Sequence, residues 1–98
     1  MARIELAPEV GDDLDRIFDY PSRHDIGNAP ARIREIIQAT SVLETNPVIG
    51  RPARRNNGEL IIGRPTHGYV ALYRYVPEVD TVFILALRSQ REAGYKRI

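Results

Sequence analysis

The sequence contains no cysteine, and its two histidines, His24 and His67, lie far apart. Without cysteine the chain can form neither disulfides nor thiolate metal sites. Two distant histidines give no basis for an imidazole metal site, so we expect no metal and no cofactor. No apolar run approaches the length of a membrane span, and the N-terminus has no signal-peptide pattern. We therefore expect a cytoplasmic protein that makes no membrane contact.

Catalytic motifs are also missing from the sequence. The chain has no phosphate-binding glycine loop, no nucleophile elbow and no pair of carboxylates in an acid–base setting. Glu9, Asp12 and Asp13 follow Pro8, a residue favoured at the first helical position, where acids match the positive end of a helix dipole. We assign these acids to a helix start rather than to an active site.

The overall composition is typical of one soluble globular domain spanning residues 1–98. Hydrophobic residues make up 43% of the chain and charged residues 28%. A chain of 98 residues can bury a single hydrophobic core without disulfides or metals. No repeat, linker or low-complexity segment divides it.

The net charge of +1 conceals an asymmetry between the two halves of the chain. Residues 1–47 carry five basic and nine acidic side chains, whereas residues 48–98 carry nine basic and four acidic ones. Either the halves neutralise each other across the fold, or the C-terminal half meets an anionic partner such as nucleic acid or an acidic protein segment. The candidate contact residues are Arg51, Arg54, Arg55, Arg64, Arg74, Arg88, Arg91, Lys96 and Arg97.

The first half of the sequence predicts a short strand followed by two helices. Residues 2–7 alternate between apolar and polar, as in a strand. Residues 8–20 show helical spacing on one face, marked by Val10, Leu14, Ile17 and Phe18. A second helix is expected to begin at Asn28 and to end before Asn46. Each helix has one apolar stripe, which predicts an antiparallel helical hairpin packed on a sheet.

The second half predicts a loop, a short strand and a hairpin. Residues 47–58 lack periodicity and are expected to form a loop, and residues 59–63 a short strand. The most hydrophobic stretch, residues 68–88, predicts two strands joined by a turn at residues 77–80. Residues 90–98 are expected to form a last helical turn, weakened by a glycine. The fold class is therefore α+β in the order β-α-α-β-β-β, with an antiparallel three-stranded sheet region and a short C-terminal tail. The place of the first strand is open.

The periodicities also predict one hydrophobic core. Its expected members are Ile4, Leu6, Leu14, Ile17, Phe18, Ile33, Ile36, Ile37, Leu43, Leu72, Phe83, Leu85 and Leu87. Tyr69, Tyr73 and Tyr75 share one face of the first hairpin strand. Two roles are open for these rings, packing in the core or against a partner and stacking on nucleic-acid bases.

Several segments together resemble the RelE/ParE superfamily, the toxin halves of bacterial type II toxin–antitoxin pairs. They are the segment PVIGRP at residues 47–52, GYVALYRY at residues 68–75 and VFILALRSQREAGY at residues 82–95. The resemblance covers nearly the whole chain and is densest from Gly50 to Tyr95. It implies a small α/β fold with an antiparallel sheet backed by the helical pair. It also implies a cognate antitoxin, whose extended or helical segment wraps the toxin to form a hetero-oligomer.

The superfamily contains two activities. RelE-like members are metal-independent mRNA endonucleases that act on the ribosome, and ParE-like members poison DNA gyrase without cleaving nucleic acid. Matching Tyr95 to the nuclease tyrosine places Ser89 where the nuclease has an arginine, and matching Tyr73 places Val70 at a second arginine position. The paired lysines of the nuclease have no lysine equivalent here. A nuclease would lose about two to three orders of magnitude in cleavage rate for each of these positioned cations that is missing.

The resemblance therefore implies a ParE-like toxin that binds DNA gyrase and has no catalytic residue. In that case the residues that contact the target or the antitoxin are Arg54, Arg55, Arg64, Arg74, Arg88, Arg91, Tyr95, Lys96 and Arg97. One alternative is a RelE-like nuclease acting on the ribosome and its mRNA, with Arg51, Arg74, Arg91 and Tyr95 in its site. A second alternative is a toxin-fold interaction protein without activity.

Overall fold

The computed structural model describes residues 1–19, 29–63 and 68–95, which form two helices and five strands. Short 3-10 turns connect some of these elements. The strands and helices are β1 (Arg3–Leu6), α1 (Val10–Asp19), α2 (Ala29–Thr40), β2 (Arg51–Ala53), β3 (Asn57–Ile62), β4 (Tyr69–Val76) and β5 (Thr81–Ser89). The 3-10 turns are η3 (Ser41–Glu44), η4 (Arg54–Asn56) and η5 (Pro77–Val79). No helix in the described ranges combines the length and the apolar character needed to cross a membrane.

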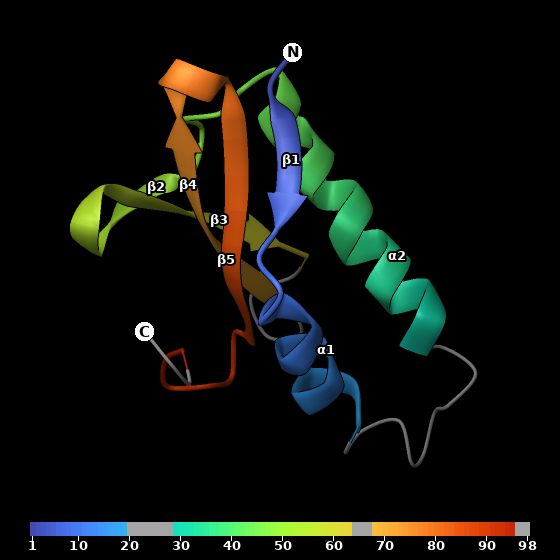
Figure 1. Cartoon of the computed structure of the whole chain (residues 1–98). Helices are drawn as coiled ribbons and strands as arrows, with labels where there is room; N and C mark the ends of the chain where they lie inside the picture. Colours follow the sequence, from blue (N-terminus) through green and yellow to red (C-terminus); the bar gives the residue numbers. More distant parts are fainter. Residues whose placement is uncertain (20–28, 64–67, 96–98) are drawn as a thin grey trace.

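The five strands form one mixed sheet in the order β1-β5-β4-β3-β2 (Figure 1). The neighbours from β2 to β5 are antiparallel, and β1 pairs with β5 in parallel. This arrangement confirms the α+β class and the predicted order of elements. It also determines the place of the first strand: β4 already has neighbours on both sides, so β1 joins the free edge of β5.

The predicted hairpin is present, and its turn follows from local chemistry. Pro77 begins η5, and Asp80 ends it in the left-handed conformation with φ of 46°. The Tyr75 hydroxyl donates to the Asp80 carboxylate at 2.7 Å, and the Thr81 hydroxyl donates to the Val79 carbonyl at 2.9 Å. Side chains on both sides of the turn therefore stabilise it.

Two local predictions are wrong. The segment 47–58, predicted as a loop, contains β2, which pairs antiparallel with β3 across the tight turn η4. A three-residue edge strand with Pro52 in its centre has no alternation to detect, and proline is tolerated at a sheet edge. The described part of the tail, up to Tyr95, forms turns and contains no helix. Its polar groups bond to α1, β3 and β5.

The core lies between the two helices and one face of the sheet. Both helices, which run in opposite directions (Figure 1), contribute to the same buried cluster. Its members from the helical segments are Val10, Ile17, Phe18, Ile36 and Leu43, and its members from the sheet include Ile62, Ala71, Tyr73, Val82 and Ile84. Tyr73 is only 3% exposed, and Tyr69 and Tyr75 pack against the cluster. These tyrosines therefore have the core-packing role.

The core prediction is right for five residues, which are Ile17, Phe18, Ile36, Leu43 and Leu87. Leu72 is also buried, but it lies on the opposite side of the sheet from this core. Leu6 is 44% exposed because it ends an edge strand. Ile37 is 45% exposed because it points away from the side of α2 on which Ile36 is buried. The remaining five, Ile4, Leu14, Ile33, Phe83 and Leu85, are only partly buried. In β5 the residues of the core cluster are Val82, Ile84 and Leu87. The uninterrupted apolar run gave no alternation from which to choose this face.

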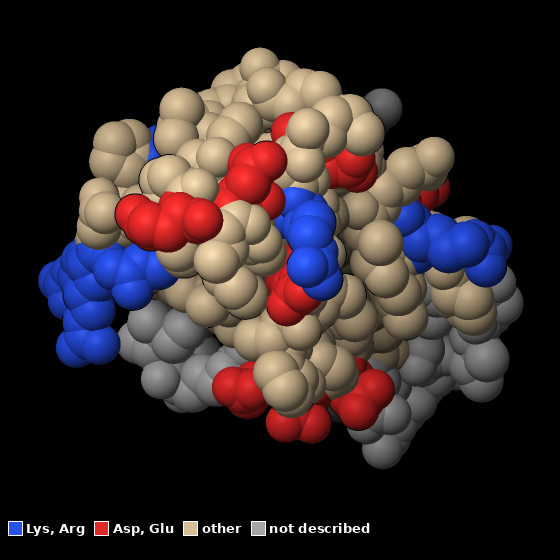
Figure 2. Space-filling view, turned by 45° about the horizontal axis from the view of Figure 1, so that its top comes forward, with Lys and Arg blue, Asp and Glu red and all other residues tan. Residues whose placement is uncertain are grey.

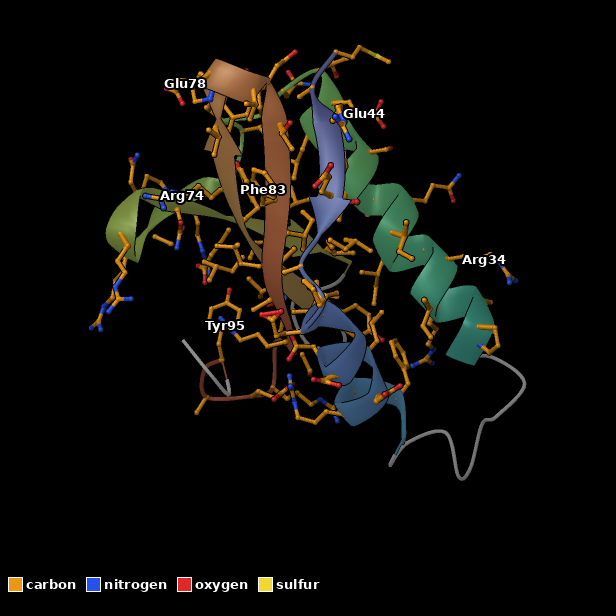
Figure 3. The ribbon with its side chains drawn as sticks, in the orientation of Figure 1. Arg34, Glu44, Arg74, Glu78, Phe83 and Tyr95 are labelled. Carbon is orange, nitrogen blue, oxygen red and sulfur yellow. The ribbon has the colours of Figure 1, made fainter. Side chains whose placement is uncertain are left out.

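The opposite side of the sheet, which we call the outer face, carries the other half of the strand residues. By register it holds the row Glu59, Leu72 and Ala86 and the row Ile61, Val70 and Arg88, with Arg51 opposite Glu59. Val70, Leu72 and Ala86 are buried although they lie outside the core cluster. The outer face and the C-terminal tail meet at Tyr95 (Figure 3).

Candidate functional site

The carboxylate of Glu59 is the centre of the polar groups on the outer face. Arg51 lies directly opposite it on β2 and donates from Nε to Oε1 at 2.8 Å. Tyr95, in the tail, donates its hydroxyl to Oε2 at 2.6 Å. The Glu59 side chain is only 15% exposed. Burial alone would raise its pKa, but the hydrogen bonds from Tyr95 and Arg51 and the charges of Arg51 and Arg88 outweigh burial and lower the pKa. Glu59 is therefore ionised at neutral pH.

Arg88, at the end of β5, holds Tyr95 from the other side. Its guanidinium carbon lies 5.2 Å from the centroid of the Tyr95 ring, within the range of a cation–π contact. One terminal nitrogen of Arg88 donates to the carbonyls of Ser89 and Glu92 at 3.3 and 3.2 Å. Burial and the hydrogen bond to Glu59 raise the pKa of Tyr95, against the opposing effect of Arg88. The phenol therefore keeps its proton at neutral pH.

A second group of cations, which we call the basic turn, consists of Arg54, Arg55 and Arg74. Arg54 and Arg55 are exposed in η4, where Arg55 has a φ of 60°. Arg74, exposed on β4, donates to the Arg55 carbonyl at 3.3 Å and so links the turn to β4. The largest group of basic side chains in Figure 2 lies at the left edge, the side on which β2 and η4 lie in Figure 1. The basic turn is a compact, accessible cationic surface.

Packing around Tyr73 determines where β2 and β3 lie. The Tyr73 hydroxyl accepts a hydrogen bond from the backbone N–H of Gly50 at 2.8 Å. A Cβ atom on Gly58 would lie 2.7 Å from the Tyr73 ring, and one on Gly50 would lie 2.6 Å from the Glu59 carbonyl. Only glycine allows the backbone to approach this closely. Gly50 and Gly58 therefore allow β2 to pair closely with β3, with Arg51 facing Glu59.

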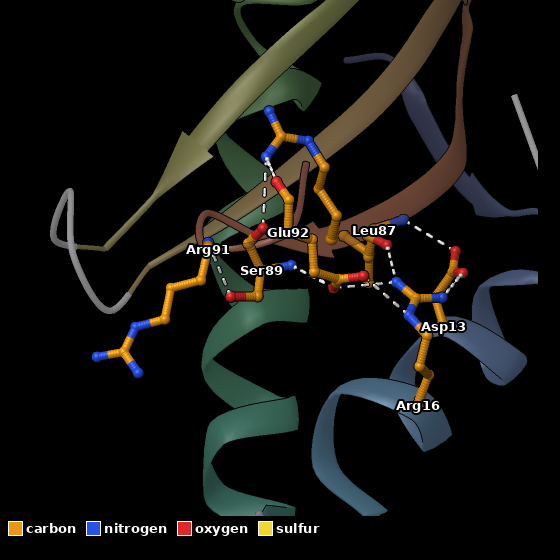
Figure 4. Close-up of polar contacts among 7 residues, drawn as sticks. Asp13, Arg16, Leu87, Ser89, Arg91 and Glu92 are labelled. Carbon is orange, nitrogen blue, oxygen red and sulfur yellow. Dashed lines mark hydrogen bonds and ion pairs between the residues drawn. The ribbon is translucent and has the colours of Figure 1, made fainter. Parts of the chain in front are cut away.

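A second polar cluster joins α1 to the end of β5 (Figure 4). Asp13, which is 1% exposed, accepts hydrogen bonds from Arg16 at 2.7 Å and from the backbone N–H of Leu87 at 2.9 Å. Arg16 also donates to the Leu87 carbonyl at 3.0 Å and to both carboxylate oxygens of Glu92, at 3.1 and 3.2 Å. Burial alone would lower the pKa of Arg16, but its bonds and charge interactions with Glu92 and Asp13 raise it. The cluster fixes the tail relative to α1.

Glu92 also determines the path of the tail toward the outer face. Its Oε1 accepts the backbone N–H of Ser89 at 2.9 Å, and its own N–H donates to the Ser89 carbonyl at 3.1 Å. These bonds close a turn directly after β5. The chain then leaves in the direction that brings Tyr95 to Glu59. Asp13 and Glu92 are thus positioning residues for the site.

The structure brings together some of the predicted site residues and separates others. Arg51, Arg88 and Tyr95 meet around Glu59, whereas Arg54, Arg55 and Arg74 form the basic turn. Arg91 is exposed, and in Figure 4 its side chain points away from the Asp13 cluster. In Figure 2 the basic side chains fall into separate groups with acidic ones between them. The predicted residues Arg64, Lys96 and Arg97 lie outside the described residues.

Sequence inspection missed three acidic residues of these clusters. In the sequence Glu59 belongs to a strand pattern, Glu92 to a family motif and Asp13 to the acidic start of a helix. The one local signal was the spacing of Asp13 and Arg16, three residues apart on a helix, which allows an ion pair. Across residues 1–19, 29–63 and 68–95, no group of three or more histidine, cysteine, aspartate or glutamate side chains could hold a metal ion.

The arrangement favours binding of anionic groups over proton transfer. The basic turn offers guanidinium donors to solvent, and these suit carboxylates or phosphates. The phenol of Tyr95, by contrast, is already hydrogen-bonded to a carboxylate, and its pKa is raised. A group in this state is a poor general base at neutral pH.

Comparison with known proteins agrees with this fold. A family model described as the ParE toxin of the type II toxin–antitoxin system parDE matches residues 4–94. A solved structure titled "Chromosomal ParDE TA system from P. aeruginosa" is similar with a TM-score of 0.74 and 20% sequence identity, covering 91% of this chain and 96% of that one. At that identity the likeness shows the same fold. No curated protein matches the chain.

Proposed function

This chain belongs to the ParE toxin family of type II toxin–antitoxin systems, and from that membership we propose that it inhibits DNA gyrase by binding it, without catalysis. A cognate antitoxin neutralises it in a hetero-oligomer, and both proteins act in the cytoplasm. The observation that supports the non-catalytic part is the hydrogen bond of 2.6 Å from the Tyr95 hydroxyl to Glu59.

A nuclease without a metal needs a general acid and base as well as cations placed against the developing charge. The residues that could serve here are Arg51, Arg74, Arg91 and Tyr95. Arg51 and Tyr95 are both bound to the Glu59 carboxylate, and Arg74 supports a turn through the Arg55 carbonyl. These contacts favour a binding surface over a nuclease site.

The test compares the wild type with Tyr95→Phe in two assays. We expect the wild type to inhibit DNA supercoiling by purified gyrase and to leave ribosome-bound mRNA intact. Tyr95→Phe removes only a hydroxyl and keeps the ring under Arg88, so its inhibition should stay within a few-fold of wild type. A nuclease that used Tyr95 as acid or base would instead lose about two to four orders of magnitude in rate. Cleavage of mRNA that Tyr95→Phe abolishes, with supercoiling untouched, would refute the proposal and establish the nuclease alternative.

The antitoxin part of the proposal is supported by the charge of the basic turn. The similar solved structure belongs to a ParDE toxin–antitoxin system, and Arg54 and Arg55 are exposed donors that carboxylates of an antitoxin segment could reach. Arg54→Glu should weaken the complex and reduce its dependence on salt. Arg34→Glu is the matched control, because Arg34 is exposed on α2, on the opposite side of Figure 3 from Arg74. Equal effects of the two reversals across a salt series would contradict contact at the basic turn.

A further inference from the structure

We propose that Glu59 is a specificity-determining residue, whose carboxylate occupies the place of an anionic ligand among Arg51, Arg88 and Tyr95 and keeps nucleic-acid phosphates off the outer face. The inference deepens the proposed function and rests on it for the view that this face binds protein. It assigns a role to the one carboxylate in the centre of the site.

The geometry is that of an anion site that the chain fills with its own residue. A guanidinium and a phenol converge on one carboxylate, at 2.8 and 2.6 Å, and each oxygen accepts one of the two donors. Phosphate oxygens have the same requirements, and arginine and tyrosine are both common donors to nucleic-acid phosphates. The Arg51 side chain is 57% exposed, so a polyanion could reach it.

The charges around Glu59 explain why its removal would change what the face binds. Glu59 is the only acidic residue on β2, η4, β3 and β4, and the same elements carry Arg51, Arg54, Arg55 and Arg74. Arg88 lies beside it on β5. Without the Glu59 charge, Arg51 and Arg88 would flank the site, and the only charged residues on β2, η4, β3 and β4 would be arginines. Such a cluster is the electrostatic pattern of a nucleic-acid surface.

The decisive substitution is Glu59→Gln, which removes the charge and keeps a carbonyl that can still accept one hydrogen bond. We expect the purified wild type to bind a fluorescent oligouridylate weakly in an anisotropy titration. Glu59→Gln should bind it about tenfold more tightly at low salt, the effect of one released charge-assisted hydrogen bond. Its salt dependence should also steepen by about 0.7 in log–log slope for each phosphate newly contacted.

Two matched variants separate this role from a general change in net charge. Glu78→Gln removes the same charge from the exposed turn η5 and should leave RNA affinity near the wild-type value. Arg51→Ala added to Glu59→Gln should abolish most of the gain. If Glu59→Gln fails to fold, Glu59→Leu carries the same expectation, because it removes the charge and keeps a similar volume.

The inference is overturned if Glu59→Gln binds RNA no better than Glu78→Gln, or if the wild type already binds as tightly as Glu59→Gln. Neither result depends on gyrase, since the titration uses only the purified protein and RNA. Failure of the wild type to inhibit supercoiling would refute the proposed function, and the RNA titration would still decide the role of Glu59.

Discussion

Replacing Asp13 with alanine tests whether the cluster at the end of β5 holds the tail to α1. The substitution removes both a buried ion-pair partner of Arg16 and the acceptor for the Leu87 N–H. A buried N–H left without an acceptor costs about 1–3 kcal/mol, and breaking a buried pair costs about 3–5 kcal/mol. Arg16 keeps its bonds to Glu92 and is partly exposed, so the two costs do not add in full. We expect a total loss of about 3–4 kcal/mol, within those ranges.

Asp12→Ala is the control, because Asp12 is exposed in the same helical turn. An acid that only complements the helix dipole contributes about 0.3–1 kcal/mol, and salt screens that contribution. Urea denaturation of both variants at low and high salt measures the difference. Asp13→Asn should fall between the two alanine variants, since its amide oxygen can still accept the Leu87 N–H. Domains of this size have an unfolding free energy of about 5–15 kcal/mol, which leaves the variants measurable.

Two results would refute the buried-cluster role of Asp13. One is a loss no greater than that of Asp12→Ala. The other is a loss that disappears at high salt, as expected for an exposed charge at a helix end. Either would mean that the hydrogen bond to Leu87 contributes little to stability and that the tail is held by other contacts.

Three further predictions concern the residues that shape the site. Gly58→Ala forces a Cβ atom to within 2.7 Å of the Tyr73 ring and should cost about 1–3 kcal/mol in urea melts. Gly11→Ala would place the new Cβ in open space and should be neutral or stabilising by up to about 1 kcal/mol. Equal losses of stability in the two variants would contradict the packing account. Tyr73→Phe removes the acceptor of the Gly50 N–H and should cost about 0.5–1.5 kcal/mol by the same measurement; no loss would mean that this bond does not hold β2 in place. Because the pKa of Tyr95 is raised above its unfolded value, the stability from its protonated phenol is complete below about pH 10 and is lost as the pH rises through the folded pKa. An absorbance titration should show Tyr95 ionising after an ordinary phenol, and Tyr95→Phe should remove that late transition; an unchanged curve would contradict the bond to Glu59.

The sequence alone determined the identity and order of the main elements, because these depend on neighbouring residues. The spacing of Val10, Ile17 and Phe18 follows the turn of a helix, and the turn from Pro77 to Asp80 separates two strongly apolar strands. Such patterns are local, and the structure confirms them. The family motifs from Gly50 to Tyr95 likewise indicated the toxin family to which the chain belongs.

The tertiary structure alone decided which side chains form the site. Tyr95 and Glu59 are 36 residues apart, and Arg16 and Glu92 are 76 apart, so no local pattern relates them. Their meeting depends on the parallel pairing of β1 with β5, on the turn that Glu92 closes and on the close pairing of β2 with β3. A charged residue has the same appearance in a sequence whether it faces solvent or neutralises a distant partner. Only the path of the chain through the fold distinguishes the two.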